Sequence, residues 1–78
     1  MKNVMTVIGI KRVDFVADDN SRIQGYRIYL IYENDKIQGQ GCTSEFLSDQ
    51  KYTDPLAVGD RVIVRYNKYG KVDSIDLV

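Results

Sequence analysis

The sequence predicts a small all-β protein with five strands. Runs of β-branched and aromatic residues are separated by clusters of Asp, Asn, Ser and Gly, which favour turns. At 78 residues the chain is expected to form one domain with a thin core. Cys42 is the only cysteine and the chain has no histidine, so neither an internal disulfide nor a common zinc site is expected. We therefore expect the core alone, or the core of a homodimer, to hold the fold together.

The first strand is predicted from Val4 to Val16. Strict alternation would place Val7 on one face and Ile10 on the other, with apolar residues on both faces near the start. Gly9 is expected to mark a bend or bulge, as in a long strand that curves around a barrel.

The segment from Arg22 to Tyr32 is the most strand-like of the chain, and it follows a turn cluster at 18–21. Its alternation predicts one face directed to the core and another directed outward. The expected core residues are Tyr26, Ile28, Leu30 and Tyr32. Arg27 and Tyr29 are expected to point outward or toward a partner.

A third strand is predicted from Lys36 to about Cys42, after a turn at 33–35. Gly39 and Gly41 would share one of its faces, where a bend is favoured over a close backbone or a large neighbouring side chain. Alternation is lost from Thr43 to Pro55, so an irregular connection is expected, with one short helical turn beginning near Ser44.

The last third of the chain predicts a hairpin. Its strands are Arg61 to Tyr66 and Lys71 to Leu77, joined by a turn at 67–70. Five strands with a longer connection between the third and fourth suit a partly open Greek-key barrel of the oligonucleotide-binding (OB) type. A different small barrel with a similar strand count is the alternative.

The sequence carries few of the groups that enzymes use. Without histidine, Cys42 lacks an imidazole partner, and no glycine-rich phosphate loop is present. The acidic residues fall mainly in predicted turns, where Asp is favoured for local hydrogen bonds. We therefore expect neither an enzyme nor a bound cofactor or metal.

Charge is balanced overall but unevenly distributed. Eleven basic residues oppose eleven acidic ones, and residues 1–27, 28–60 and 61–78 carry +2 (five minus three), −4 (two minus six) and +2 (four minus two). No stretch approaches the length of a membrane span, and the N-terminal apolar run lacks a clear cleavage site. A soluble, cytoplasmic protein is expected, and the unpaired Cys42 is compatible with a reducing compartment.

Basic residues interleaved with tyrosines form the best candidate site, because cations hold phosphates while rings stack on bases. The predicted residues are Arg27, Tyr29, Arg61, Arg65, Lys68, Tyr69 and Lys71. Tyr26, Tyr32 and Tyr66 are instead expected in the core or at the barrel rim. A solvated strand edge explains Arg61 and Arg65 equally well. The leading hypothesis is single-stranded nucleic-acid binding, and its rival is a protein-interaction module with an exposed apolar patch.

The hairpin also carries a resemblance. Val58, Gly59 and Asp60 precede a strand that ends at Tyr66-Asn67, followed by a Tyr69-Gly70-Lys71 turn. With the RIQGYRIYLIY segment, this pattern resembles small proteins of phages and integrative elements of Gram-positive bacteria, some labelled single-stranded DNA-binding. The resemblance covers most of the chain and is most specific in its last third. It implies a compact five-stranded domain, similar in architecture to the dimeric helix-destabilising proteins of filamentous phages.

Overall fold

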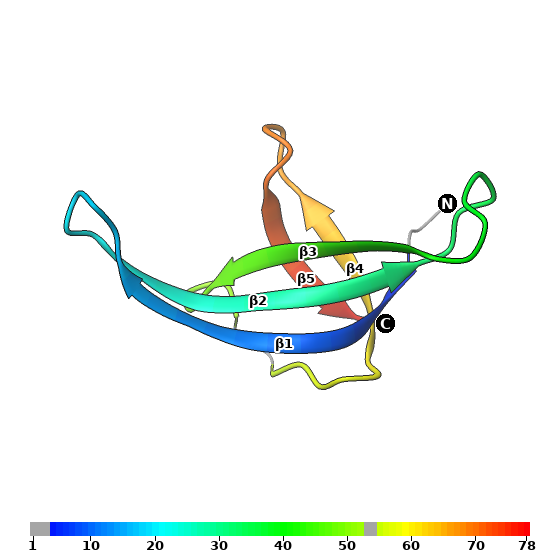
Figure 1. The fold of residues 1–78 in the computed structure, drawn as a ribbon, viewed down its shortest axis with the longest axis horizontal. Coiled ribbons are helices and arrows are strands. Elements are labelled where there is room, and N and C mark those ends of the chain that lie inside the picture. The colour runs from blue at the N-terminus through cyan, green and yellow to red at the C-terminus, as the bar shows by residue number, and fades with distance from the viewer. Residues whose placement is uncertain (1–3, 53–54) are drawn as a thin grey trace.

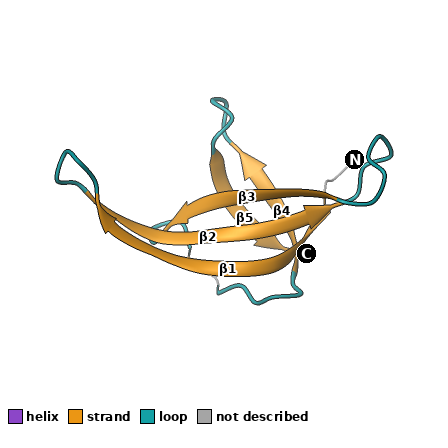
Figure 2. Ribbon diagram, in the orientation of Figure 1, coloured by secondary structure: helices purple, strands orange, loops and turns teal. Residues whose placement is uncertain are grey.

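A computed structural model describes residues 4–52 and 55–78 and confirms an all-β protein (Figure 1). None of the described residues lies in a helix (Figure 2). The five strands are β1 (Val4–Val16), β2 (Arg22–Tyr32), β3 (Gly41–Ser48), β4 (Arg61–Tyr66) and β5 (Val72–Leu77). The described part of the chain therefore contains no helix that could cross a membrane.

The strands form one antiparallel sheet in the order β3-β2-β1-β4-β5. Strand β1 pairs with β2 over most of its length and with β4 only at its start, Val4 to Thr6. As a result β1, β2 and β3 form a curved layer, and the β4–β5 hairpin crosses behind it (Figure 1).

The outer strands β3 and β5 share no described ladder, so the sheet is open. Side chains nevertheless bridge this gap. The Tyr66 hydroxyl donates to Glu45 Oε1 at 3.1 Å, and Lys51 Nζ donates to the Val72 carbonyl at 3.1 Å. The two edges therefore lie close enough for single side chains to span them.

The core receives residues from every strand and from the loop before β4. Its fully or nearly buried members are Val7, Ile28, Leu30, Leu47, Leu56, Val62 and Ile75. The predicted core positions Ile28 and Leu30 are confirmed at 0% exposure. Tyr26 is half-buried against this core, and its ring stacks on Tyr52 with 4.2 Å between the ring centroids.

Gly9 lies at a β-bulge, as predicted, because the β1–β2 register shifts between Val7 and Gly9. Val7 pairs with Leu30 and Ile10 pairs with Ile28, so Val7 and Ile10 share the core side. The prediction that Val7 and Ile10 lie on opposite faces is therefore wrong. The bulge adds one residue to β1, which reverses the alternation after it.

The predicted third strand is wrong in position. Residues 36–40 lie in the loop after β2, where Gly39 has a φ of 95°, and β3 begins only at Gly41. A Cβ atom at Gly41 would overlap the Tyr32 ring. Gly41 therefore accommodates a large neighbouring side chain, and the favoured interpretation of a bend is not supported there.

The predicted irregular or helical connection is also wrong over its first part, since Thr43 to Ser48 belong to β3. A short turn follows, in which the amides of Lys51 and Tyr52 both donate to the Ser48 carbonyl at 2.9 Å. Residues 53–54 of the predicted segment lie outside the described residues. The sequence pattern failed because β3 mixes polar and apolar residues on both faces, and among them only Leu47 is a buried large side chain.

The C-terminal hairpin is confirmed, with β4 at the predicted bounds and β5 beginning one residue later than predicted. In its turn, Asn67 Oδ1 accepts hydrogen bonds from the amides of Tyr69 and Lys71 at 2.9 and 3.1 Å. Gly70 adopts a φ of 77°, which favours glycine. The turn therefore projects Lys68 and Tyr69 from the end of the hairpin.

Candidate nucleic-acid interface

The side of the β1–β2–β3 layer turned away from the core is here called the outer face. Its residues follow from the strand register, because directly paired residues of antiparallel strands share a face. They are Thr6, Gly9, Lys11, Val13 and Phe15 on β1, Ile23, Gly25, Arg27, Tyr29 and Ile31 on β2, and Cys42, Ser44, Phe46 and Ser48 on β3. Within these described strands, none of the outer-face positions is acidic.

Two cations occupy the middle of the outer face. Lys11 pairs directly with Arg27, and Arg27 pairs with Phe46 on its other side. Like charges directly opposite each other destabilise a sheet, and no acid on this face offsets the repulsion. An anionic ligand would relieve it.

Two aromatic rings flank the cation pair, and each lies across a glycine. Tyr29 pairs with Gly9, and a Cβ added to Gly9 would lie 3.4 Å from Tyr29 Cδ2. Phe46 leans over Gly25, where an added Cβ would lie 2.6 Å from Phe46 Cζ. Tyr29 is 37% exposed, as predicted from the sequence, and Phe46 is half-buried. Gly25 thus leaves room for the Phe46 ring to lie on the sheet beside the cations, whereas a Cβ at Gly9 would make only an ordinary contact with Tyr29.

A groove continues from the outer face over the β3 edge toward the β4–β5 turn. Phe46 lines both surfaces, and Ser48, Lys51, Gly70 and Lys71 line the groove with it. Glu45 and Val72 complete the lining. The Glu45 carboxylate accepts the Tyr66 hydroxyl, so part of its hydrogen-bonding capacity is already used.

The predicted site residues are divided between these surfaces. Arg27 and Tyr29 lie on the outer face, and Lys71 lines the groove. Lys68 and Tyr69 lie at the hairpin tip, where Tyr69 is 74% exposed and Lys68 Nζ sits 5.2 Å from its ring centroid. The structure thus brings Arg27 and Lys71 to two sides of Phe46.

The two β4 arginines lie apart from this set. Arg61 pairs with Thr6, at the border where the outer face passes from β1 to β4. Arg65 lies farther along β4, and its Nε donates to Asp76 Oδ2 at 2.6 Å. Among the predicted cations, Arg65 is thus the one that forms an ion pair with a described acid, and its place in the site stays a prediction.

Tyr66 is the last residue of β4 and is 47% exposed. Partial burial and the neighbouring Glu45 carboxylate raise its pKa, because both disfavour the charged phenolate. The predicted placement of Tyr66 in the core is therefore wrong, and its placement at a barrel rim stays a prediction.

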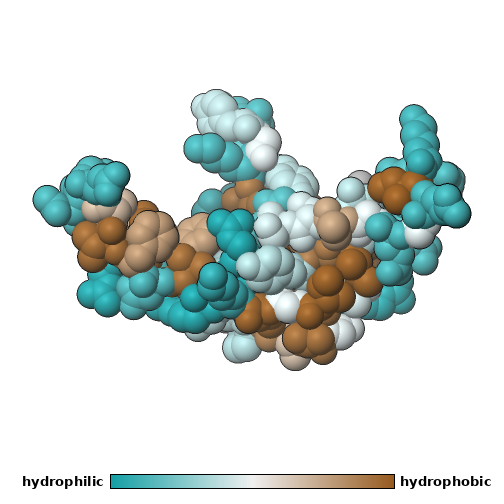
Figure 3. Space-filling model, in the orientation of Figure 1, coloured by the Kyte–Doolittle hydropathy of each residue, from teal (hydrophilic) through white to brown (hydrophobic). Residues whose placement is uncertain are grey.

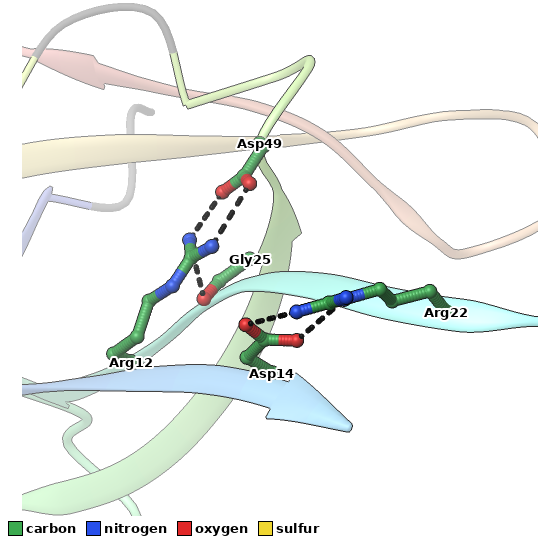
Figure 4. Close-up of polar contacts among 5 residues, drawn as sticks. All are labelled: Arg12, Asp14, Arg22, Gly25 and Asp49. Atoms are coloured by element: carbon green, nitrogen blue, oxygen red, sulfur yellow. Dashed lines mark hydrogen bonds and ion pairs between the residues drawn. The ribbon is translucent and has the colours of Figure 1, made fainter. Parts of the chain in front are cut away.

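Near the end of β1 and the start of β2, two ion pairs hold Asp14 and Asp49 on or beside the face opposite to the outer face (Figure 4). Arg12 binds Asp49 through two contacts of 2.5 and 3.1 Å, and Arg22 binds Asp14 through contacts of 3.0 and 3.1 Å. The hydrogen bond from Arg22 lowers the pKa of Asp14. Both acids point away from Lys11 and Arg27, since they lie on or beside the face opposite to the outer face.

Sequence reasoning missed three residues of the candidate interface: Lys11, Phe46 and Lys51. Strict alternation would place Lys11 on the same face as Val7, whereas the bulge near Gly9 puts it on the opposite one. Phe46 and Lys51 fell in the segment expected to be irregular or helical. The pairing of an outward aromatic residue with a strand glycine was the signal that could have found Phe46.

No protein-family model matches the chain, and no curated protein or solved structure matches it either. The candidate function therefore depends on the geometry of the chain itself.

Proposed function

We propose that the protein binds single-stranded nucleic acid, most readily single-stranded DNA, across the outer face of β1–β2–β3 and the adjoining groove. The observation that carries this proposal is that Lys11 and Arg27 occupy directly paired positions beside Tyr29 and Phe46, on a face whose described strand positions include no acid. Such a pair costs stability in the free protein. A bound phosphate backbone turns it into a favourable contact.

In this mechanism the cations neutralise phosphates while bases stack on Tyr29 and Phe46. Beyond Phe46, the strand crosses the β3 edge and meets Lys51 and Lys71 in the groove. Zero net charge is compatible with this mechanism, because binding depends on local charge and the outer-face positions of the described strands include no acid.

We also propose that the open sheet is a partly open barrel of the OB type. Its strand order leaves β3 and β5 as the two edges, and the Glu45–Tyr66 and Lys51–Val72 contacts bridge them. OB folds bind oligonucleotides on strands 2 and 3 and on the loops between strands 1–2 and 4–5. Here β2, β3 and the loop between strands 4 and 5 carry Arg27, Tyr29, Phe46 and the 67–71 turn, which supports the same ligand class, whereas the loop between strands 1 and 2 carries none of the candidate residues.

An interaction with protein is the second candidate, and it is favoured by exposed apolar residues. Phe15 is 53% and Val16 is 62% exposed at the end of β1, beyond the core. Figure 3 shows hydrophobic residues along the left arm of the molecule and on the lower right part of its central body, with hydrophilic residues at the tips. A second copy of the chain is the partner we propose for this end, giving a homodimer.

The direct test is fluorescence anisotropy of a labelled oligo-dT at low salt. Wild type and Arg65→Gln should bind alike, because Arg65 is paired with Asp76 off the outer face. Arg27→Gln should bind weakly. Absence of wild-type binding at tens of micromolar protein would end the proposal.

A further inference from the structure

A second concave surface lies where β1 separates from β2 to join β4. Its walls come from the start of β1, the end of β2, the loop after β2, the start of β3, and β4. The β1–β2 ladder ends at Thr6–Ile31, while β1 continues along β4 from Thr6 to Val4. This divergence of β1 and β2 opens the hollow, which we call the end hollow.

The end hollow has a charged region and an aromatic region. Arg61 and Tyr66, at opposite ends of β4, both line it. Their Cα atoms are separated by about 16 Å if β4 rises by about 3.3 Å per residue. Tyr32 adds a second ring, covering Gly41 at the start of β3. A single ligand that meets both regions needs an anionic part and a flat part joined by a spacer.

Polar side chains between the two regions offer both donors and acceptors. Asn34 and Gln40 present amides, Thr43 presents a hydroxyl, and Glu33 presents a carboxylate. Asn34 Oδ1 already accepts the amide of Lys36 at 2.8 Å. Such groups match the hydrogen-bonding edge of a nucleobase, which carries donors and acceptors side by side.

Arg61 is the cation of this site. Among the described acidic residues none forms an ion pair with it, in contrast to Arg65, which is paired with Asp76. Guanidinium groups bind phosphates through paired N–H donors. Glu33 is the only other charged residue on the described lining, and it lies at the end of β2.

We propose that the end hollow binds a nucleoside monophosphate, with its phosphate on Arg61 and its base against Tyr32. The nucleotide is either free or the terminal residue of a bound strand. The terminal case rests on the proposed function, since the hollow adjoins the outer face through Thr6 and Ile31. The free case does not depend on it.

The free case is tested by equilibrium dialysis of the whole protein against thymidine 5′-monophosphate, with thymidine and inorganic phosphate as partial ligands. The monophosphate should bind more tightly than either part. Arg61→Gln should weaken it about tenfold or more, the usual effect of losing a charged hydrogen bond. Arg65→Gln, in the same strand but off the hollow, is the matched control and should leave binding unchanged.

The terminal case is tested by comparing a linear oligo-dT with a circular one of equal length. Tighter binding of the linear form, lost in Arg61→Gln, assigns the hollow to strand ends. The proposal is overturned if the monophosphate does not bind and the two oligonucleotides bind equally. It is also overturned if Arg65→Gln weakens the monophosphate as much as Arg61→Gln does.

These results separate the two proposals. Monophosphate binding without any oligonucleotide binding would keep the end hollow and remove the outer-face function. Oligonucleotide binding that depends on Arg27 but not on Arg61, with no bound monophosphate, would keep the outer-face function and remove the end hollow.

Discussion

The salt dependence of oligonucleotide binding follows directly from the number of cations at the interface. Lys11 and Arg27 lie on the outer face, and Lys51 and Lys71 line the groove, so the proposed interface offers four cations to phosphates. At about −0.7 per contact for single strands, the slope of log K against log salt should be about −2.8. A fourfold rise in salt, from about 50 to about 200 mM, should then weaken binding about 50-fold.

The assay is anisotropy of labelled oligo-dT at several salt concentrations, for wild type and single variants. Arg27→Gln should change the slope to about −2.1, because one contact is lost. Phe46→Leu should lower affinity by about 1–3 kcal/mol through lost stacking, with the slope unchanged. Arg65→Gln should alter neither quantity. A wild-type slope near zero, or an Arg65→Gln slope change as large as that of Arg27→Gln, would refute this placement of the cations.

Three further predictions concern the fold that holds this surface. Gly25→Ala should destabilise the protein by about 1–3 kcal/mol in urea unfolding and weaken oligo-dT binding. The added Cβ would lie 2.5 Å from the Leu47 carbonyl oxygen and 2.6 Å from Phe46 Cζ. Unchanged stability would contradict this prediction. Leu30→Ala should cost about 2–5 kcal/mol, since Leu30 is fully buried, and a loss below 1 kcal/mol, on the order of a surface change, would count against the assigned core. Hydrogen bonding to Arg22 lowers the pKa of Asp14 below its ordinary 3.8, so the stability from this pair is complete above that pH and is lost as the pH falls through the folded-state pKa. Urea unfolding from pH 6 to pH 2 should therefore show a smaller acid loss in Asp14→Asn than in wild type, and equal losses would exclude this contribution.

Much of the fold could be predicted because its signals are local. In β2, alternating apolar residues that include Ile28 and Leu30 mark the buried face. Turn residues mark the connection between the two hairpin strands, β4 and β5. The position of β3 could not be predicted, because its inner side includes Glu45 beside Leu47. That polar residue is accommodated by Tyr66, which is 21 positions away in the sequence.

The candidate site was harder to predict than the fold, because it depends on register. Arg27 and Tyr29 could be assigned outward from the β2 pattern alone. Placing Lys11 opposite Arg27 requires knowledge of how the bulge at Gly9 shifts the β1–β2 ladder. The pairing of Arg65 with Asp76 likewise depends on the β4–β5 register, so the sequence could not distinguish this arginine from Arg27.

The most direct test of the central claim is an NMR titration of the ¹⁵N-labelled protein with a short oligo-dT, following each backbone amide. We predict that the largest shifts occur at Lys11, Arg27, Tyr29, Phe46 and Lys71, while Arg65 and Asp76 stay unchanged. Shifts confined to residues of β4 and β5, or no shifts at all, would contradict the assignment of the outer face of β1–β2–β3 as the nucleic-acid interface.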